Sequence, residues 1–363
     1  MLVEIRTPVS YAVLAPIADA LAAWPDVQMW YTSESPDRIK PLLPAGRFLT
    51  HAEVEWRRFD LYLNGDPWAP ARLRRCARRV NFFHGVAGKY DLDQPSGLPI
   101  GFECYDRVAF INRDRMLRYL RADIVTAAQA VLVGYPKLDQ LASGGFDGAV
   151  IRASLGLRPG CPTALYAPTY SVASSLHLAG EGIVRALAGA GLNVIVKLHD
   201  RSLDPDPRYT AGVDWRARFS ALEKELEPGA MRFVETSDAS PLLAAADCMV
   251  TDHSSVGFEY LVLDRPLIVF DAPDLAEAAR INPEKIVLLR GAATIVPTTD
   301  QLAAAAIHAL DNPVHLSAAR RMVARALFFD PGHATARAVE LLRGLVLPGA
   351  GAIGAKRQPE GVS

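Results

Sequence analysis

The fold is decided by one stretch of the sequence, Ala246-Asp247-Cys248-Met249-Val250-Thr251-Asp252-His253-Ser254-Ser255-Val256-Gly257-Phe258-Glu259-Tyr260. A short apolar run meets polar residues and then a helical pattern, which is typical of a βα unit in a parallel sheet. Ser254 or Ser255 can cap the helix, whose free amides and positive dipole end favour a phosphate. Glu259 lies four residues after Ser255, on the same helix face, where it can accept hydrogen bonds from ribose hydroxyls. An ordinary serine cap with a solvent-facing glutamate fits the same pattern.

The same alternation of apolar runs and amphipathic stretches extends over the rest of the chain. It predicts an α/β fold with two Rossmann-like parallel-sheet domains, residues 1–150 and 151–345, facing a cleft between them. Gly- and Pro-rich segments near residues 143–160 mark the boundary, and residues 346–363 read as a disordered tail. The expected strands are Leu2–Ile5, Val27–Tyr31, Arg79–Phe83, Arg107–Ile111, Ala130–Val133, Thr163–Tyr166, Asn193–Lys197, Asp247–Val250 and Pro266–Phe270.

Composition excludes several classes of protein. Of 363 residues, 50% are hydrophobic and 22% charged, which is too apolar for a disordered chain. Lys and Arg number 39 against 40 Asp and Glu, so no global field attracts nucleic acid. The four cysteines form no CxxC pair, which argues against a zinc knuckle or a disulfide framework. With no signal-peptide pattern and no long apolar segment, we expect a cytoplasmic protein.

Other polar clusters also follow predicted strands. His84 comes directly after the strand that ends at Phe83, and an imidazole there can take a proton from a hydroxyl at neutral pH. Lys197 and His199 are two residues apart at a strand end, so both can point toward phosphate oxygens. The Pro-Gly turn at residues 331–332 opens a helix start that includes Thr335. Taken singly, each cluster also has an ordinary structural interpretation.

Two further patterns carry less information. Five arginines in eight residues can contact an anionic membrane surface, although such a run is more often a solvated helix face. They are Arg72, Arg74, Arg75, Arg78 and Arg79. The two D-x-D sequences, residues 91–93 and 204–206, are too short to predict a metal site, and we expect none.

Taken together, the clusters resemble the CDP-glycerol glycerophosphotransferase family of teichoic acid primases and polymerases. Six short matches occur in the family's order between about residue 80 and residue 340. They are His84-Gly85 with Lys89, Gly134-Tyr135-Pro136-Lys137, Tyr166-Ala167-Pro168-Thr169, Lys197-x-His199, Thr251-Asp252-His253-Ser254-Ser255 through Tyr260 with Arg265-Pro266, and Asp330-x-Gly332-x-Ala334-Thr335.

The resemblance implies a GT-B architecture and metal-independent transfer of a phospho-alcohol unit from a CDP-activated donor to an acceptor hydroxyl. The acceptor would be lipid-linked or polymeric. Apart from the resemblance, the arginine run offers a peripheral contact with the inner face of the membrane. In this scheme His84 is the general base, and His199 stabilises the donor phosphates. The other implied contacts are Thr169, Lys197, Ser254, Ser255, Gly332 and Thr335 for the phosphates and Glu259 for the ribose.

Two alternatives stay open. The chain departs from the family pattern after His84 and on both sides of His199, so the transferred group and the acceptor are not fixed. A GT-B glycosyltransferase or 2-epimerase that uses a UDP-sugar would share the phosphate-binding logic. A non-catalytic nucleotide-binding protein would also keep the cleft.

Overall fold

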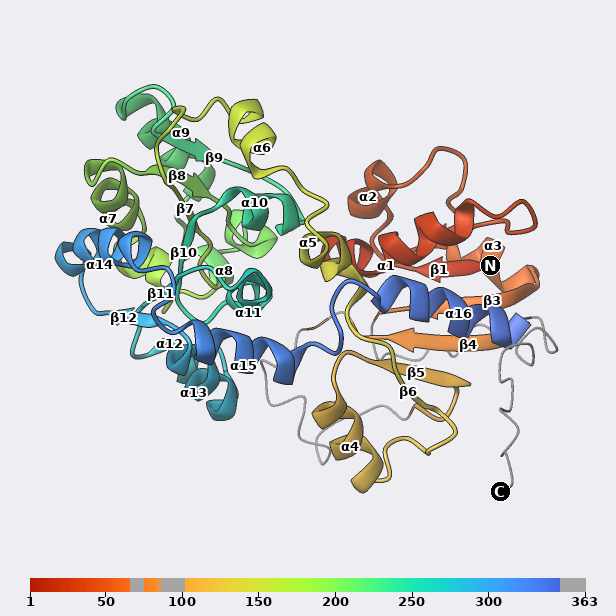
Figure 1. The fold of residues 1–363 in the computed structure, drawn as a ribbon. Coiled ribbons are helices and arrows are strands. Elements are labelled where there is room, and N and C mark those ends of the chain that lie inside the picture. Colours follow the sequence, from red (N-terminus) through yellow and green to blue (C-terminus); the bar gives the residue numbers. More distant parts are fainter. Residues whose placement is uncertain (66–74, 84, 86–101, 347–363) are drawn as a thin grey trace, which may run out of the picture.

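The computed structural model describes residues 1–65, 75–83, 85 and 102–346, and its core is a pair of six-stranded sheets (Figure 1). All neighbouring strands in both sheets run parallel, which confirms the predicted α/β class. The first sheet has the order β2-β1-β3-β4-β5-β6, with strands at Trp30–Thr32, Leu2–Glu4, Phe59–Asn64, Cys76–Phe82, Arg107–Phe110 and Ala130–Leu132. The second has the order β12-β11-β10-β7-β8-β9, with strands at Thr294–Val296, Leu267–Phe270, Cys248–Thr251, Thr163–Tyr166, Asn193–Val196 and Met231–Phe233.

Helices connect the strands, as parallel pairing requires. Local sequence signals define the start of helix α1, where Thr7 and Ser10 form a capping box and Pro8 occupies the first turn. The helices of the N-terminal half are α1 (Pro8–Ala22), α2 (Pro36–Ile39), α3 (His51–Trp56) and α4 (Arg113–Arg121). Those that follow are α5 (Asp139–Ala142), α6 (Gly148–Ser154), α7 (Ser175–Gly189), α8 (Pro207–Thr210), α9 (Trp215–Glu225), α10 (Ser240–Ala245), α11 (Ser255–Tyr260), α12 (Leu275–Ala278), α13 (Pro283–Gly291), α14 (Thr299–Asp311), α15 (Ser317–Leu327) and α16 (Ala334–Val346). Short 3₁₀ helices lie at η1 (Lys40–Leu42), η4 (Pro136–Leu138), η5 (Asp200–Leu203) and η6 (Leu261–Leu263).

The last helix returns to the N-terminal half of the molecule. Helix α16 lies beside α1 and β3 (Figure 1), and Ala334, Ala338 and Leu342 are buried in the core of the first sheet. The predicted C-terminal domain, residues 151–345, includes α16. In the structure the apolar face of α16 packs against the first sheet instead. Val346, expected to begin the tail, is the last residue of α16, and residues 347–363 lie outside the described part.

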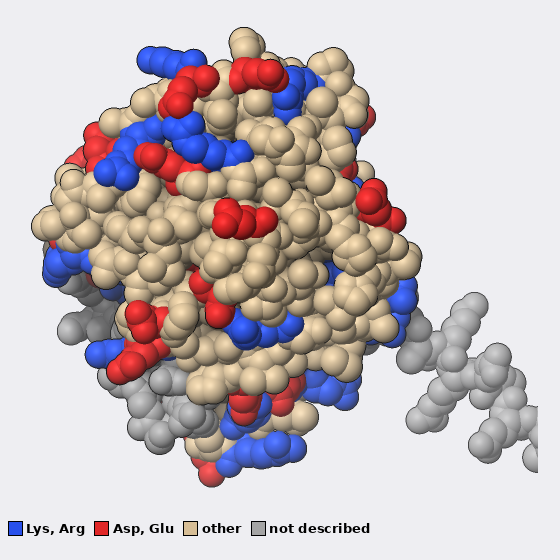
Figure 2. Space-filling view, turned by 90° about the vertical axis from the view of Figure 1, so that its left-hand side faces the viewer, with Lys and Arg blue, Asp and Glu red and all other residues tan. Residues whose placement is uncertain are grey.

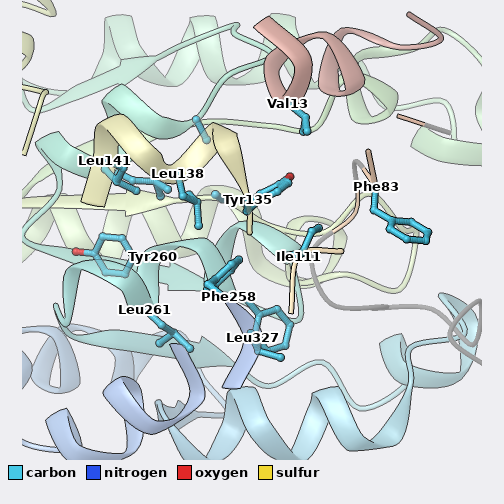
Figure 3. Close-up of a cluster of buried hydrophobic side chains, with 14 of the residues drawn as sticks. Val13, Phe83, Ile111, Tyr135, Leu138, Leu141, Phe258, Tyr260, Leu261 and Leu327 are labelled. Atoms are coloured by element: carbon cyan, nitrogen blue, oxygen red, sulfur yellow. The ribbon is translucent and has the colours of Figure 1, made fainter. Parts of the chain in front are cut away.

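One hydrophobic core runs across the junction of the two halves. Figure 3 shows Tyr135, Leu138 and Leu141 from the connection after β6 beside Phe258 and Tyr260 of α11, all in one buried cluster. Burying apolar area on both sides of a connection stabilises one arrangement of the halves. The residues at this junction are therefore held by packing as well as by the chain.

The surface and the cysteines agree with the expectations from composition. Figure 2 shows acidic and basic side chains interspersed over the face of the second sheet's half. The four cysteines are free thiols, and burial raises the pKa of Cys248 to about 12. Within the described ranges, no helix has both the length and the apolar character needed to cross a bilayer.

Candidate active site

The predicted donor residues converge at one edge of the second sheet. Strand β7 lies between β8 and β10, so the carboxyl ends of these strands bring together the segments that follow them. Backbone hydrogen bonds fix this register: Lys197 N donates to Tyr166 O at 3.0 Å, and Ala167 N donates to Val250 O at 3.0 Å. Thr169, Lys197, His199 and Ser254 therefore belong to adjoining loops.

A buried carboxylate joins two of these loops. Asp252 is fully buried, and its two oxygens accept hydrogen bonds from Thr169 N at 2.9 Å, Ser175 N at 3.1 Å and Ser175 Oγ at 2.9 Å. The amide of His253 also donates to it, at 2.6 Å. Hydrogen bonds to a carboxylate are stronger than those between neutral groups, so Asp252 holds the β7–α7 loop to the end of β10. Asp252 was not predicted to have this role, although its position directly after a buried strand is a signal for it.

Ser254 and Ser255 begin α11, as the sequence predicted. Ser254 is the N-cap residue in extended conformation, but its hydroxyl makes no capping hydrogen bond to the helix. Ser254 is buried and Ser255 is half-buried. The Ser254 hydroxyl is thus not used by its own helix.

Glu259 is not on a solvent-facing surface. Its Oε2 accepts a hydrogen bond from Lys137 Nζ at 2.7 Å, and the two side chains are only 4% and 5% exposed. The ribose contact expected for Glu259 stays a prediction; in the structure its carboxylate pairs with Lys137, which approaches from η4 in the connection between the halves. Lys137 belongs to the Gly134–Lys137 motif, but spacing along the chain gives no sign of this partner.

Lys197 lies near this pair and is itself 6% exposed. Burial lowers its pKa, and the positive charge of Lys137 lowers it further, while Asp200, Glu259 and Asp238 act in the opposite direction. Within the described part of the chain, its ammonium forms no hydrogen bond or ion pair. A desolvated ammonium that makes no ion pair within the described residues is a favourable site for a phosphate.

His199 is oriented by its neighbours. Its Nδ1 accepts a hydrogen bond from Arg201 N at 3.1 Å, which places the proton of the neutral ring on Nε2. The ring of Tyr170 packs against the imidazole with centroids 4.3 Å apart, and the Arg201 guanidinium lies 5.1 Å from the Tyr170 centroid. A half-buried imidazole held in this way can present an Nε2–H donor to an oxygen of a substrate.

The backbone amides at the start of α16 bond a carboxylate of the chain itself. Asp139 accepts hydrogen bonds from Gly332 N at 2.9 Å and Ala334 N at 3.0 Å, and its other oxygen accepts from Thr335 N. Asp139 therefore satisfies these amides and the positive end of the helix dipole. The Thr335 hydroxyl is buried and has no hydrogen-bond partner among the described residues, and the phosphate contacts expected of Gly332 and Thr335 stay predictions. Asp139 was missed because it is distant in sequence and only the fold brings it there.

Several predicted residues lie outside the described part of the chain. These are His84 and Lys89, as well as Arg72 and Arg74 of the arginine run. Arg75 and Arg78 are exposed, and Arg78 is on strand β4, not on a helix face, and pairs with Asp106 at 2.9 Å. Among the described residues, no group of three or more His, Cys, Asp or Glu side chains is arranged to hold a metal ion.

A family model describes this arrangement. Residues 113–342, more than half of the chain, match the model of CDP-glycerol:poly(glycerophosphate) glycerophosphotransferase. The chain belongs to this glycerophosphotransferase family. The match includes the Lys137 connection, the loops after β7, β8 and β10, and most of α16. It confirms the resemblance drawn from the six motifs, and it makes the chain a transferase.

Solved structures confirm the GT-B fold of this glycerophosphotransferase. The wall teichoic acid polymerase TagF is 16% identical with a TM-score of 0.69, covering 95% of this chain and 89% of its own. A putative UDP-N-acetylglucosamine 2-epimerase from Listeria monocytogenes is 14% identical with a TM-score of 0.56, covering 94% and 95%. The UDP-GlcNAc 2-epimerase from Neisseria meningitidis is 12% identical with a TM-score of 0.56, covering 94% and 98%. No curated protein matches the sequence.

Proposed function

We propose that this glycerophosphotransferase moves a glycerophosphate-like unit from a CDP-activated donor to an acceptor hydroxyl, without a metal ion. The observation that carries the proposal is the buried ammonium of Lys197 at the carboxyl edge of the second sheet, next to the loops of Thr169 and Ser254. Diphosphate charge is commonly offset by Mg²⁺; here Lys197, the Nε2–H of His199 and the serine hydroxyls would offset it.

In the proposed reaction, the acceptor oxygen attacks the distal phosphorus of the donor. A new phosphoester bond forms, the bond to the CMP oxygen breaks, and CMP leaves with the electron pair. His84 would take the hydroxyl proton, and Lys197 with His199 would stabilise the negative charge that develops on the leaving phosphate. The family description and a TagF structure obtained after soaking with CDPG favour a cytidine donor over the UDP-sugars of the epimerases.

Calorimetric titration with CMP, CDP-glycerol, UDP and UDP-GlcNAc in EDTA tests the choice of donor. We expect cytidine-selective binding that Ser255→Ala weakens, followed by CMP release when a polyol-phosphate acceptor is added. Uridine selectivity would support the UDP-sugar reading instead. Cytidine binding with no turnover over any acceptor would support a non-catalytic protein.

We also propose a cytoplasmic location with contact at the inner face of the membrane. Exposed Arg75 and Arg78 support such contact, since basic side chains near a surface are attracted to anionic lipids. Co-sedimentation with vesicles containing 30% anionic lipid, compared with neutral vesicles, tests it; equal pelleting with both would contradict it.

A further inference from the structure

The role of Lys137 goes beyond these assignments and rests on the proposed function. Lys137 belongs to η4, whose neighbours Tyr135 and Leu138 are packed in the core between the two halves. Its ammonium therefore has little freedom, and it is bonded to Glu259 at 2.7 Å in a nearly dry environment. In such surroundings, removing either partner leaves the other as an uncompensated buried charge.

The charges around Lys197 explain why the Lys137–Glu259 pair matters for donor binding. The charged groups that shift the pKa of Lys197 include the Lys137 ammonium and the carboxylates of Asp200, Glu259 and Asp238. Two of the carboxylates have other partners. Asp200 lies 3.9 Å from Arg38, and Asp238 accepts hydrogen bonds from Ser240 N at 2.9 Å and Ser240 Oγ at 2.7 Å. Glu259 is the carboxylate whose partner is another lysine.

A carboxylate near an unpaired ammonium competes with any phosphate for that ammonium. Without Lys137, Glu259 would be an unpaired buried anion whose charge acts on Lys197, a desolvated cation. Forming that internal pair would satisfy both groups and cancel the charge that a diphosphate needs. With Lys137 present, its ammonium neutralises Glu259, so the carboxylate does not compete for Lys197.

We propose that Lys137 is a positioning residue for donor binding: by holding Glu259, it keeps the charge of Lys197 available to the diphosphate. Lys137 reaches the site from the connection between the halves, so this role also links the donor site to the junction. The inference gives Glu259 a charge-balancing role in place of the ribose contact expected from sequence.

The test uses Lys137→Met, Glu259→Gln and the double variant in the full-length protein. Each is titrated with CDP and, as a phosphate-free probe, with cytidine. We expect K137M to weaken CDP binding at least tenfold and leave cytidine affinity unchanged. In the double variant, which has no free carboxylate to capture Lys197, CDP affinity should return to within about threefold of wild type.

Three outcomes would overturn the inference. One is a folded double variant that binds CDP as poorly as K137M. Another is K137M with wild-type affinity for CDP. The third is loss of cytidine affinity in E259Q, which would restore the ribose role. If K137M does not fold, the comparison of E259Q with the double variant decides: both must bind CDP close to wild type. Failure of the proposed function is distinguishable, because then the wild-type protein itself would bind neither CDP nor CDP-glycerol.

Discussion

Lys137 Nζ lies 2.7 Å from Glu259 Oε2, and this buried ion pair joins the connection after the first sheet to a helix of the second. The two residues are 122 positions apart in sequence, and both side chains are almost fully buried. The pair is therefore part of what holds the two halves together, in addition to its proposed part in donor binding.

Breaking the pair from one side should destabilise the protein more than removing it altogether. Removing one partner of a buried pair leaves an uncompensated charge and costs about 3–5 kcal/mol, whereas replacing both is often nearly neutral. We expect K137M to lose roughly this much free energy of unfolding in urea, and K137M/E259M to recover most of it. Additive losses in the double variant would contradict the burial of a coupled pair.

Replacing Lys197 should stabilise the protein while it loses its ligand. The pKa of Lys197 is lowered chiefly by burial, so its charge is less stable in the folded protein than in the unfolded chain. Lys197→Met removes this penalty, and each kcal/mol gained raises Tm by about 2–4 °C in a domain of 150–250 residues and by less in this longer chain. Calorimetry should show a higher Tm for the donor-free variant and no rise on adding CDP. A lower Tm would show that Lys197 is already paired.

The same lowered pKa fixes the sign of a pH effect. Between that pKa and the ordinary value of 10.5, the unfolded chain binds more protons than the folded one, so the Lys197 contribution to stability rises with pH. The gain of K197M over wild type should therefore be largest below this window and shrink as pH rises through it. Urea unfolding at several pH values measures the difference, and a gain that grows with pH would contradict the assignment.

The Tyr170 ring should help to orient His199. The ring packs 4.3 Å from the imidazole, so Tyr170→Ala removes a wall of the site, whereas Tyr170→Phe keeps it. We expect Y170A to lower kcat about tenfold with a smaller change in KM, and Y170F to remain near wild type. Removing the imidazole in His199→Ala should lower kcat roughly 100-fold, as loss of an acid–base group does. Equal losses in Y170A and Y170F would point to a role for the hydroxyl instead.

Asp252 should matter for both stability and donor binding. Asp252→Asn replaces an acceptor oxygen by an N–H₂ group facing backbone N–H donors, so at least one hydrogen bond to Thr169 or Ser175 is lost. Leaving a buried donor unsatisfied costs about 1–3 kcal/mol. We expect that loss in urea unfolding together with a raised Kd for CDP. A Ser174→Ala variant in the same loop is the matched control, since the Ser174 hydroxyl has no hydrogen-bond partner among the described residues.

Local sequence patterns predicted much of the fold because parallel strands are buried on both faces and read as apolar runs. Cys248–Thr251 and Asn193–Val196 are such runs, and the polar residues after them lie at the sheet edge as expected. Strand Phe59–Asn64 was missed since Asp60 and Asn64 interrupt its apolar pattern, although it lies near the centre of the first sheet.

Partners distant along the chain could not be predicted in this way. Spacing placed Glu259 on a helix face but could not reveal that Lys137, 122 positions away, covers it. A helix start with free amides also looks the same in sequence whether a phosphate or a carboxylate occupies it. Asp139 occupies the start of α16, 193 residues from Gly332.

Substitution of Asp139 tests whether the fold or the donor uses the start of α16. Asp139 satisfies amides at the first turn of α16, so Asp139→Ala should behave as loss of an N-cap and destabilise the protein by about 0.5–2 kcal/mol. If Asp139 and not the donor occupies this helix end, the Kd for CDP should stay within about twofold of wild type. Thr335→Val is the matched control, because it removes a hydroxyl and keeps the backbone amide that bonds Asp139. Titration and urea unfolding of both variants measure these effects. A large loss of CDP affinity in T335V would return the start of α16 to the donor site.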